Sequence, residues 1–328
     1  FRQAMRIMGH QFVMGRTINE ALERAATGDD ARYRHTYDML GESALTAADA
    51  DRYMKSYRAA IASVGAVAQS GSTPASWPSI SVKLSALHPR YEFGRREQVL
   101  SELGARIEAL AIDASDAGIA LTIDAEEADR LELSLELLDR LLRQPRLAGW
   151  EGLGLAVQAY SKRAMDVLRH LGLRADETGR VLNVRLVKGA YWDSEVKRAQ
   201  ERGLPGYPVY TRKQNTDVAY LACARILLDG SRRLYPQFAT HNAHTVASII
   251  HLAAARRREF EFQRLHGMGD ELYSEVTDPA GRALPCRVYA PVGSHEDLLP
   301  YLVRRLLENG SNTSFVNRVV DESLPLEE

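Results

Sequence analysis

The amino-acid sequence predicts an α/β protein built as a closed (βα)8 barrel. Eight short segments along the chain are either continuously apolar or alternate between apolar and polar residues, which is the pattern of strands. Longer stretches with apolar residues three and four positions apart separate them, and this spacing is typical of amphipathic helices. Regular strand–helix alternation implies parallel pairing through right-handed crossovers, and eight such units favour a closed barrel.

The first strand is predicted at residues 33–41 and is the most weakly marked of the eight. The others are predicted at 79–87, 120–127, 153–160, 181–189, 236–242, 260–267 and 286–293. Helical spacing is clearest at 97–118, 129–142, 161–172 and 243–257. A doubly wound open sheet would show a similar alternation, so the pattern leaves this second architecture open.

The barrel is predicted to span residues 33–318, after a leading helical segment at 1–32 and before a tail at 319–328. The leading segment is expected to hold one helix at about 1–26, and its start at Phe1 within a helical pattern indicates a piece of a longer polypeptide. A last helix is predicted after the eighth strand, because Ser294 and Asp297 form a capping-box pattern and Gly310 is a typical stop. One face of this helix carries polar and aromatic residues: Tyr301, Arg304, Arg305 and Glu308.

Composition narrows the class of protein. The chain has 328 residues, 45% hydrophobic and 26% charged, with a formal net charge of -1, which is ordinary for a folded soluble domain. Near-neutral charge argues against nucleic acid as the main partner, because phosphate binding usually leaves a basic footprint. The two cysteines, Cys223 and Cys286, belong to no paired motif and suggest reduced thiols in the cytosol. No apolar run reaches the roughly 18 residues of a membrane-spanning helix.

Polar residues gather where the predicted strands end. In a barrel of this kind the active site lies at the carboxyl ends of the strands. An ionised group that is buried there costs several kcal/mol unless it is paired or contacts a ligand. Six of the eight predicted strands carry such residues, so the sequence predicts a large polar ligand at this end of the barrel. They are Lys83, Asp124, Gln158, Arg185, Lys188, His241, Asn242 and Tyr289.

These residues admit other interpretations. Lys83 or Lys188 could form a Schiff base, as in barrel aldolases, although nothing nearby in the sequence obviously depresses a lysine pKa. His241 and His244 could bind a metal, but no HExxH motif or carboxylate triad completes a site. A non-catalytic barrel that senses a ligand would also use polar strand ends. The glycines around Gly152 lack the third glycine of a dinucleotide fingerprint and precede a strand instead of following one.

Six segments closely resemble the proline dehydrogenase domain of bacterial proline utilization A proteins. They read SVKLSALHPRY, LTIDAEEADRLELSL, RLVKGAYWDSEVKRAQ, FATHNAHT, FEFQRLHGMG and YLVRRLLENGSNTSFVNR, and the likeness runs in order from about Tyr33 to Arg318. The resemblance implies a distorted, TIM-like (βα)8 barrel whose last helix lies over the mouth. It also implies non-covalent FAD and oxidation of L-proline to Δ1-pyrroline-5-carboxylate, by hydride transfer from proline Cδ to flavin N5.

The same resemblance implies a substrate site. The proline carboxylate is expected to pair with Arg304, Arg305 and Lys83, and paired guanidiniums suit one small anion. Asp124 is expected to orient the charged network, and Glu42 to gate the site through an arginine. The residues expected around the pyrrolidine ring are Ala190, Tyr191, Leu265, Tyr289 and Tyr301. The catalytic set implied in this way is Lys83, Asp124, Arg185, Tyr289, Arg304 and Arg305.

The implied cofactor site follows the third to sixth strands and the last helix. Arg185 and Val187 are expected near flavin N5 with Gln158 close by, and Glu308 and Ser314 on the adenosine side. The full set is Asp124, Gln158, Arg185, Val187, Lys188, Gly189, Ala190, Trp192, Thr211, Lys213, Thr240, His241, Asn242, Glu308 and Ser314. No metal is expected.

Partners are implied by the resemblance as well. Family members pass electrons to a membrane quinone, and the parent chain carries an aldehyde dehydrogenase domain. A cytoplasmic location is expected, with peripheral contact at the inner membrane face through the parent protein. No nucleic acid is expected to bind this part of the chain.

Overall fold

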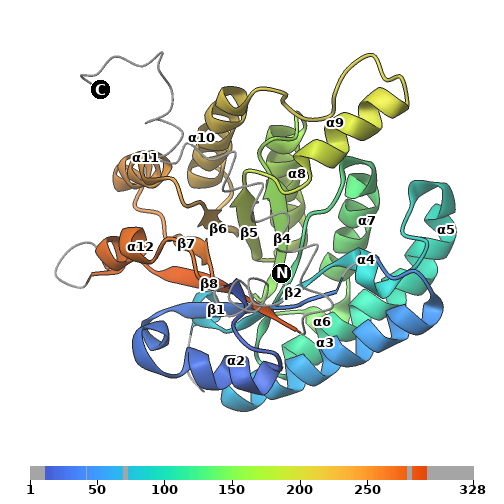
Figure 1. The fold of residues 1–328 in the computed structure, drawn as a ribbon, viewed down its shortest axis with the longest axis horizontal. Helices are drawn as coiled ribbons and strands as arrows, with labels where there is room; N and C mark the ends of the chain where they lie inside the picture. The colour runs from blue at the N-terminus through green and yellow to red at the C-terminus, as the bar shows by residue number, and fades with distance from the viewer. Residues whose placement is uncertain (1–11, 42, 69–72, 279–282, 294–328) are drawn as a thin grey trace, which may run out of the picture.

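The computed structural model describes residues 12–41, 43–68, 73–278 and 283–293. Its centre is a closed barrel of eight parallel strands in the order β1 to β8 (Figure 1). The strands are β1 (Arg34–Met39), β2 (Ser79–Val82), β3 (Ala120–Ile123), β4 (Leu153–Gln158), β5 (Leu182–Val187), β6 (Leu234–Ala239), β7 (Glu261–Leu265) and β8 (Cys286–Val292). The first strand pairs with the last over six residues, from Arg34 with Arg287 to Met39 with Val292. This closure confirms the predicted barrel and excludes the doubly wound sheet.

Helices surround the barrel, as Figure 1 shows. They are α2 (Ile18–Ala25), α3 (Ala47–Val67), α4 (Leu84–Leu87), α5 (Arg96–Gln98), α6 (Gly104–Asp116), α7 (Leu131–Leu142), α8 (Ala164–Thr178), α9 (Trp192–Glu201), α10 (Lys213–Asp229), α11 (Ala243–Ala254) and α12 (Asp270–Thr277). Each strand from β1 to β7 is followed by at least one helix, in the right order for parallel crossovers. The predicted last helix lies outside the described residues.

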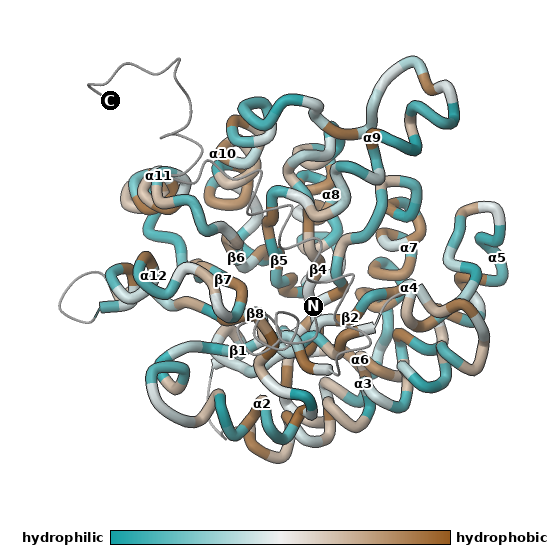
Figure 2. Tube along the Cα trace, in the orientation of Figure 1, coloured by the Kyte–Doolittle hydropathy of each residue, from teal (hydrophilic) through white to brown (hydrophobic). Residues whose placement is uncertain are grey.

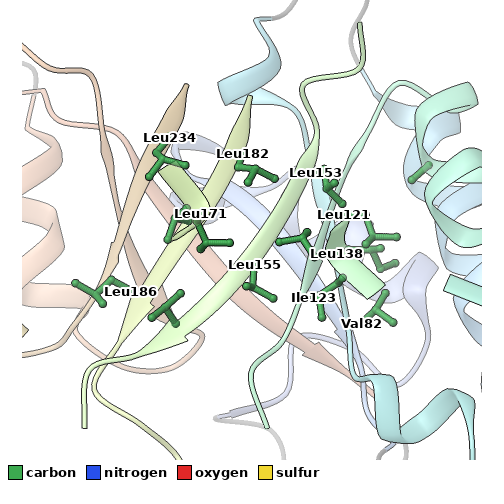
Figure 3. Packing of buried hydrophobic residues seen from close by; sticks show 14 of the residues in the cluster. Val82, Leu121, Ile123, Leu138, Leu153, Leu155, Leu171, Leu182, Leu186 and Leu234 are labelled. Atoms are coloured by element: carbon green, nitrogen blue, oxygen red, sulfur yellow. The ribbon is translucent and has the colours of Figure 1, made fainter. Parts of the chain in front are cut away.

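The hydrophobic core lies between the strands and the helices. Successive strand residues point to opposite faces, and the outward positions are aliphatic or aromatic along most of the sheet. Figure 3 shows Leu121, Leu153 and Leu182 on the strands together with Leu138 of α7 and Leu171 of α8. Figure 2 shows the hydrophobic colour gathered on strands and neighbouring helices, with hydrophilic residues in the outer loops.

The inside of the barrel is polar, which explains the alternating strand pattern. Strands of a parallel sheet are buried on both faces and usually read as continuous apolar runs. Here Arg185 of β5 donates hydrogen bonds across the lumen to Ser81 of β2 and Gln263 of β7. Neither β2 nor β7 is adjacent to β5 in the sheet. The lumen is therefore filled by hydrogen-bonded side chains, where most barrels of this kind stack branched aliphatic residues.

Three predicted elements differ clearly from the structure, and one is the third strand, which was expected at 120–127 but ends at Ile123. The second strand was expected at 79–87, but β2 ends at Val82 because its partner β3 ends at Ile123, opposite that residue. Residues 84–87 form α4 instead, and all four are buried. The leading helix expected at about 1–26 is not continuous: the Met14 N–H donates to Pro291 O at 2.9 Å, and Gly15 bridges to Val292 of β8. A new helix, α2, begins after the Thr17 cap.

Candidate active site

Four charged side chains form a buried network at the carboxyl end of the barrel. Lys83 follows β2, and its Nζ lies 2.8 and 2.9 Å from the two carboxylate oxygens of Asp38 in β1. The same Nζ is 3.2 Å from Asp124, which follows β3. The other oxygen of Asp124 accepts from Nη1 of Arg185 at 2.6 Å. Two formal positive charges thus meet two formal negative charges, and the network is balanced without a ligand.

Tyr289 of β8 completes the network. Its hydroxyl donates to Asp124 at 2.7 Å and accepts from Lys83 Nζ at 3.3 Å. Burial raises the pKa of this phenol well above its ordinary value, and the neighbouring Asp124 carboxylate raises it further. The hydroxyl therefore keeps its proton and acts as a donor to Asp124. The Arg185 guanidinium lies over the Tyr289 ring, 5.1 Å from its centroid.

At Lys83 and Asp124 the neighbouring charges outweigh the effect of burial on the pKa. Burial would lower the pKa of Lys83, but Asp38, Tyr289 and Asp124 hold it well above the ordinary value. Burial would raise the pKa of Asp124, but Lys83 and Arg185 hold it below its usual range. Lys83 is therefore protonated and Asp124 ionised at neutral pH. A protonated lysine cannot attack a carbonyl, so this geometry does not favour the Schiff-base interpretation at Lys83.

Lys188 behaves differently, contrary to the expectation that nothing depresses a lysine pKa here. Burial lowers its pKa, although an ion pair with Asp217 of α10 opposes the shift. Lys213, the first residue of α10, binds the other oxygen of Asp217 at 2.9 Å. Two lysines thus share one carboxylate, which leaves an excess positive charge beside the loop that follows β5. The first turn of α10, which begins at Lys213, has no side-chain cap for its backbone N–H groups.

The loops after β3 and β5 are held together by Gln158, the last residue of β4. Its Nε2 donates to Glu126 O at 2.8 Å and its Oε1 accepts from Ala190 N at 3.1 Å. Gly189, the residue before Ala190, has φ of +142°, and a Cβ at this position would overlap the ring of Tyr160. Only glycine therefore lets this loop pass so close to Tyr160. Trp192 begins α9, and its indole N–H donates to Tyr210 O at 2.9 Å.

The residues predicted after β6 and β7 lie at the same end of the barrel. Asn242 caps α11, since its Oδ1 accepts from the Thr245 N–H at 2.9 Å and from the Thr245 hydroxyl at 3.0 Å. His241 Nε2 accepts from the backbone N–H of Leu265 at 3.0 Å, and Thr240 is buried. Within the described ranges, no three His, Cys, Asp or Glu side chains lie close enough together to hold a metal ion.

The structure places some of the remaining predicted residues and does not describe the others. Glu42, Tyr301, Arg304, Arg305, Glu308 and Ser314 are outside the described residues. Thr211 is exposed in the loop before α10, and Val187 ends β5. Tyr191, the residue before α9, is half-buried.

Sequence reasoning missed three members of the network. Asp38, Ser81 and Gln263 are all buried and bind Lys83 or Arg185. Each lies in the interior of its strand, whereas most of the predicted site residues lie at or just after strand ends. The available signal was the period of two within the strands, which places Asp38 on the same face as Thr36, and Gln263 on the same face as Leu265.

A closed barrel with a buried charged network at the carboxyl ends of its strands defines the chain as a barrel enzyme. Comparison with known proteins identifies its family. The family model described as proline dehydrogenase matches residues 21–318, so the chain belongs to the proline dehydrogenase family. Members of this family are oxidoreductases that act on proline.

Its similarity to individual proteins covers nearly the whole chain. The bifunctional protein PutA of Salmonella typhimurium is 56% identical over 330 residues, which cover 99% of this chain and 25% of that protein. The corresponding protein of Rhizobium meliloti is 51% identical over 327 residues, covering 99% and 26%. A crystal structure of proline utilization A from Bradyrhizobium japonicum has a TM-score of 0.87 and 54% identity, covering 99% of this chain and 33% of that one. The chain thus spans about a quarter of the length of these curated relatives.

No helix among the described residues combines the length and the apolar character that crossing a membrane requires.

Proposed function

We propose that the chain oxidises L-proline to Δ1-pyrroline-5-carboxylate with non-covalently bound FAD, as the first step of proline catabolism to glutamate. The observation that carries this proposal is the buried network of Lys83, Asp38, Asp124, Arg185 and Tyr289 at the barrel mouth. The chain belongs to a family of oxidoreductases that act on proline. A preorganised set of charged and polar side chains, such as this network, is what binding a small charged substrate requires.

Charge balance indicates where the substrate carboxylate binds. Within the network, the positive charges of Lys83 and Arg185 are already matched by Asp38 and Asp124. A further anion therefore needs a further cation, and the predicted pair Arg304 and Arg305 would supply two guanidiniums with fixed, forked donors. Lys83 would contribute to this site as part of the network. Ala190, Tyr191, Leu265, Tyr289 and Tyr301 are proposed to surround the pyrrolidine ring.

The residues present fit FAD. Arg185 Nη2 is a buried donor without a hydrogen-bond partner among the described residues, which suits an acceptor atom of the isoalloxazine ring. The excess positive charge of Lys188 and Lys213 and the uncapped start of α10 suit a pyrophosphate. Gly189 lets the loop that carries Ala190 pass against Tyr160, which keeps the Ala190 N–H bound to Gln158 at the proposed cofactor site. The remaining cofactor contacts proposed are Asp124, Val187, Ala190, Trp192, Thr211, Thr240, His241, Asn242, Glu308 and Ser314.

In the proposed reaction the C–H bond at proline Cδ breaks, its hydride leaves with both electrons, and a C=N bond forms. The flavin, when bound, would supply the hydride acceptor at N5. The amine of the substrate must also lose a proton. Neither Lys83, whose pKa is raised, nor Asp124, whose pKa is lowered, suits a general base near neutral pH. We therefore propose that Lys83 and Asp124 orient the substrate and balance charge, and that solvent accepts the proton.

The electrons are proposed to pass to a membrane quinone, with the chain in the cytoplasm and in peripheral contact with the membrane. The pyrroline product would then be oxidised further by an aldehyde dehydrogenase domain in a longer parent chain. Relatives four times as long as this chain support a parent protein with additional domains.

An absorbance titration tests the proposed function. The purified protein is loaded with FAD and L-proline is added under anaerobic conditions. Proline is expected to bleach the flavin band, which reports cofactor, substrate and reaction together. D-proline serves as the matched control, since an arginine pair and a shaped ring pocket select one enantiomer. A flavin band that L-proline leaves unchanged, or a protein that does not retain FAD, would refute the proposal.

A further inference from the structure

We propose that Gln263 is a positioning residue that fixes the Arg185 guanidinium for its contact with the cofactor. The inference rests on the proposed function, because it takes the partner of Arg185 to be the flavin. It assigns a role to Gln263 and to the buried ion pair beneath it, which lie deeper in the barrel than the catalytic set.

The Arg185 guanidinium is held at two of its three nitrogens. Nε donates to Gln263 Oε1 at 2.7 Å. Nη1 donates to Ser81 Oγ at 2.9 Å and to Asp124 Oδ1 at 2.6 Å. Because the guanidinium is planar and rigid, these three bonds fix the position of its third nitrogen, Nη2. Nη2 is buried and has no hydrogen-bond partner in the described part of the chain, so it is the donor left for a ligand.

The orientation of the Gln263 amide is determined by Glu261, which lies nearer the amino end of the barrel. A glutamine amide presents an acceptor oxygen on one side and a donor nitrogen on the other. The Nε2 of Gln263 donates to Glu261 Oε1 at 3.1 Å, and an ionised carboxylate can only accept. The oxygen of Gln263 must therefore face upward, toward Arg185. If the amide flipped, two donors would meet at Arg185 and two acceptors at Glu261.

Glu261 is kept ionised by two arginines. Burial would raise its pKa, but Arg287 and Arg34 hold it below the usual range. Arg287 Nε donates to Glu261 Oε1 at 2.6 Å, and Arg34 Nη1 donates to Glu261 Oε2 at 2.9 Å. Glu261 is fully buried and Arg287 is 2% exposed. A fixed charge at the amino end of the barrel thus determines the direction of a hydrogen-bond chain that ends at Arg185.

Gln237 provides a matched control. Its Nε2 also donates to Glu261 Oε1, at 2.8 Å, and it is buried in the same lumen. Gln237 faces Arg185 in the β5–β6 register, but among the described residues its side chain makes no hydrogen bond to the Arg185 guanidinium. Replacing either glutamine by methionine removes one hydrogen bond to Glu261. Only Gln263→Met also removes the acceptor of the Arg185 Nε–H. The two variants therefore separate a positioning role from a purely structural one.

The test measures the flavin midpoint potential and kcat of Q263M and Q237M in the full chain loaded with FAD. We expect Q263M to make the potential more negative, because a displaced guanidinium stabilises reduced flavin less, and to lower kcat on the order of tenfold. Q237M is expected to keep the wild-type potential. Thermal unfolding should show similar losses of stability in both variants. In an R185M background, Q263M is expected to have no further effect on the potential.

Three outcomes would overturn the inference. Q263M and Q237M could shift the potential equally, or Q263M could shift it as strongly in the R185M background. If Q263M does not fold, Q263L takes its place with Q237L as its control, and Q263L is expected to have a lower kcat than Q237L. Equal kcat values in that pair would contradict the role. Failure of the wild-type chain to bind FAD would instead refute the proposed function. Because FAD binding is measured on the wild type, this result is separate from the comparison of the variants.

Discussion

Gly189 shows how a single residue shapes the site. Its φ of +142° lies outside the range that residues with a side chain readily adopt, and its missing Cβ leaves space for the Tyr160 ring. The loop it belongs to runs from Lys188 to Tyr191, between the lysine pair and the predicted substrate contacts. A change at this position should therefore disturb the loop and the cofactor contacts together.

We expect Gly189→Ala to destabilise the fold by about 2–3 kcal/mol more than Gly179→Ala, because the added methyl must displace a buried tyrosine. Gly179 is the matched control, since its φ is +68° and no atom lies within 4 Å of an added Cβ. Urea unfolding gives both values, and titration with FAD gives the affinity. G189A should also bind FAD more weakly than G179A. Equal stability and equal FAD affinity in the two variants would show that the close approach to Tyr160 is unimportant.

At the scale of elements, the helices that follow the strands begin at the mouth of the barrel. Asn242 is both the cap of α11 and a predicted cofactor contact. Its Oδ1 is already bound to Thr245, so any contact with a cofactor has to use its amide nitrogen or its backbone. Thr46 caps α3 in the same way, through a capping box with Asp49, and it is exposed. The two caps can therefore be compared.

Asn242→Ala and Thr46→Ala are each expected to lower the free energy of unfolding by about 1 kcal/mol, the usual value of a helix cap. Only N242A should also weaken FAD binding, which can be measured by fluorescence titration of the flavin. If N242A binds FAD as tightly as T46A does, Asn242 is a helix cap and has no part in the cofactor site.

At the scale of the whole molecule, buried histidines couple the fold to pH. Burial lowers the pKa of His266 to about 3, and Arg24, Arg264 and His35 add to the effect. Burial also lowers the pKa of His35 to about 4, together with Arg287 and Arg264. Both imidazoles are thus neutral in the folded state and gain a proton on unfolding below the ordinary histidine pKa of about 6.5.

The sign of the pH effect follows from this difference. Between pH 6.5 and about 4 the unfolded chain binds more protons than the folded one, so the free energy of unfolding falls as the pH falls. Each histidine contributes a slope of about 1.4 kcal/mol per pH unit in this range. His266→Gln should reduce the slope by about that amount in urea unfolding at several pH values. If H266Q and the exposed-site variant H251Q give the same slope, burial of His266 does not set the acid sensitivity.

The order of the eight strands, and the end of the barrel at which the charged network lies, could be predicted from the sequence. Both depend on local patterns: the apolar period of each element and the polar residues beside strand ends. Lys83, Asp124, Arg185 and Tyr289 were predicted in this way and lie together. The ends of β2 and of the leading helix were not predicted, because β3 and β8 determine them through pairing.

Only the tertiary structure decided which partner each charged group has. Asp38 pairs with Lys83, 45 residues away, and Gln263 binds Arg185, 78 residues away. No local period links such positions, because closure of the barrel brings together strands that are distant in the sequence. The sequence by itself determined which elements form and what chemistry they carry. Closure determined that the charges balance inside the lumen, because pairing in a buried space depends on distance between atoms and not on separation along the chain.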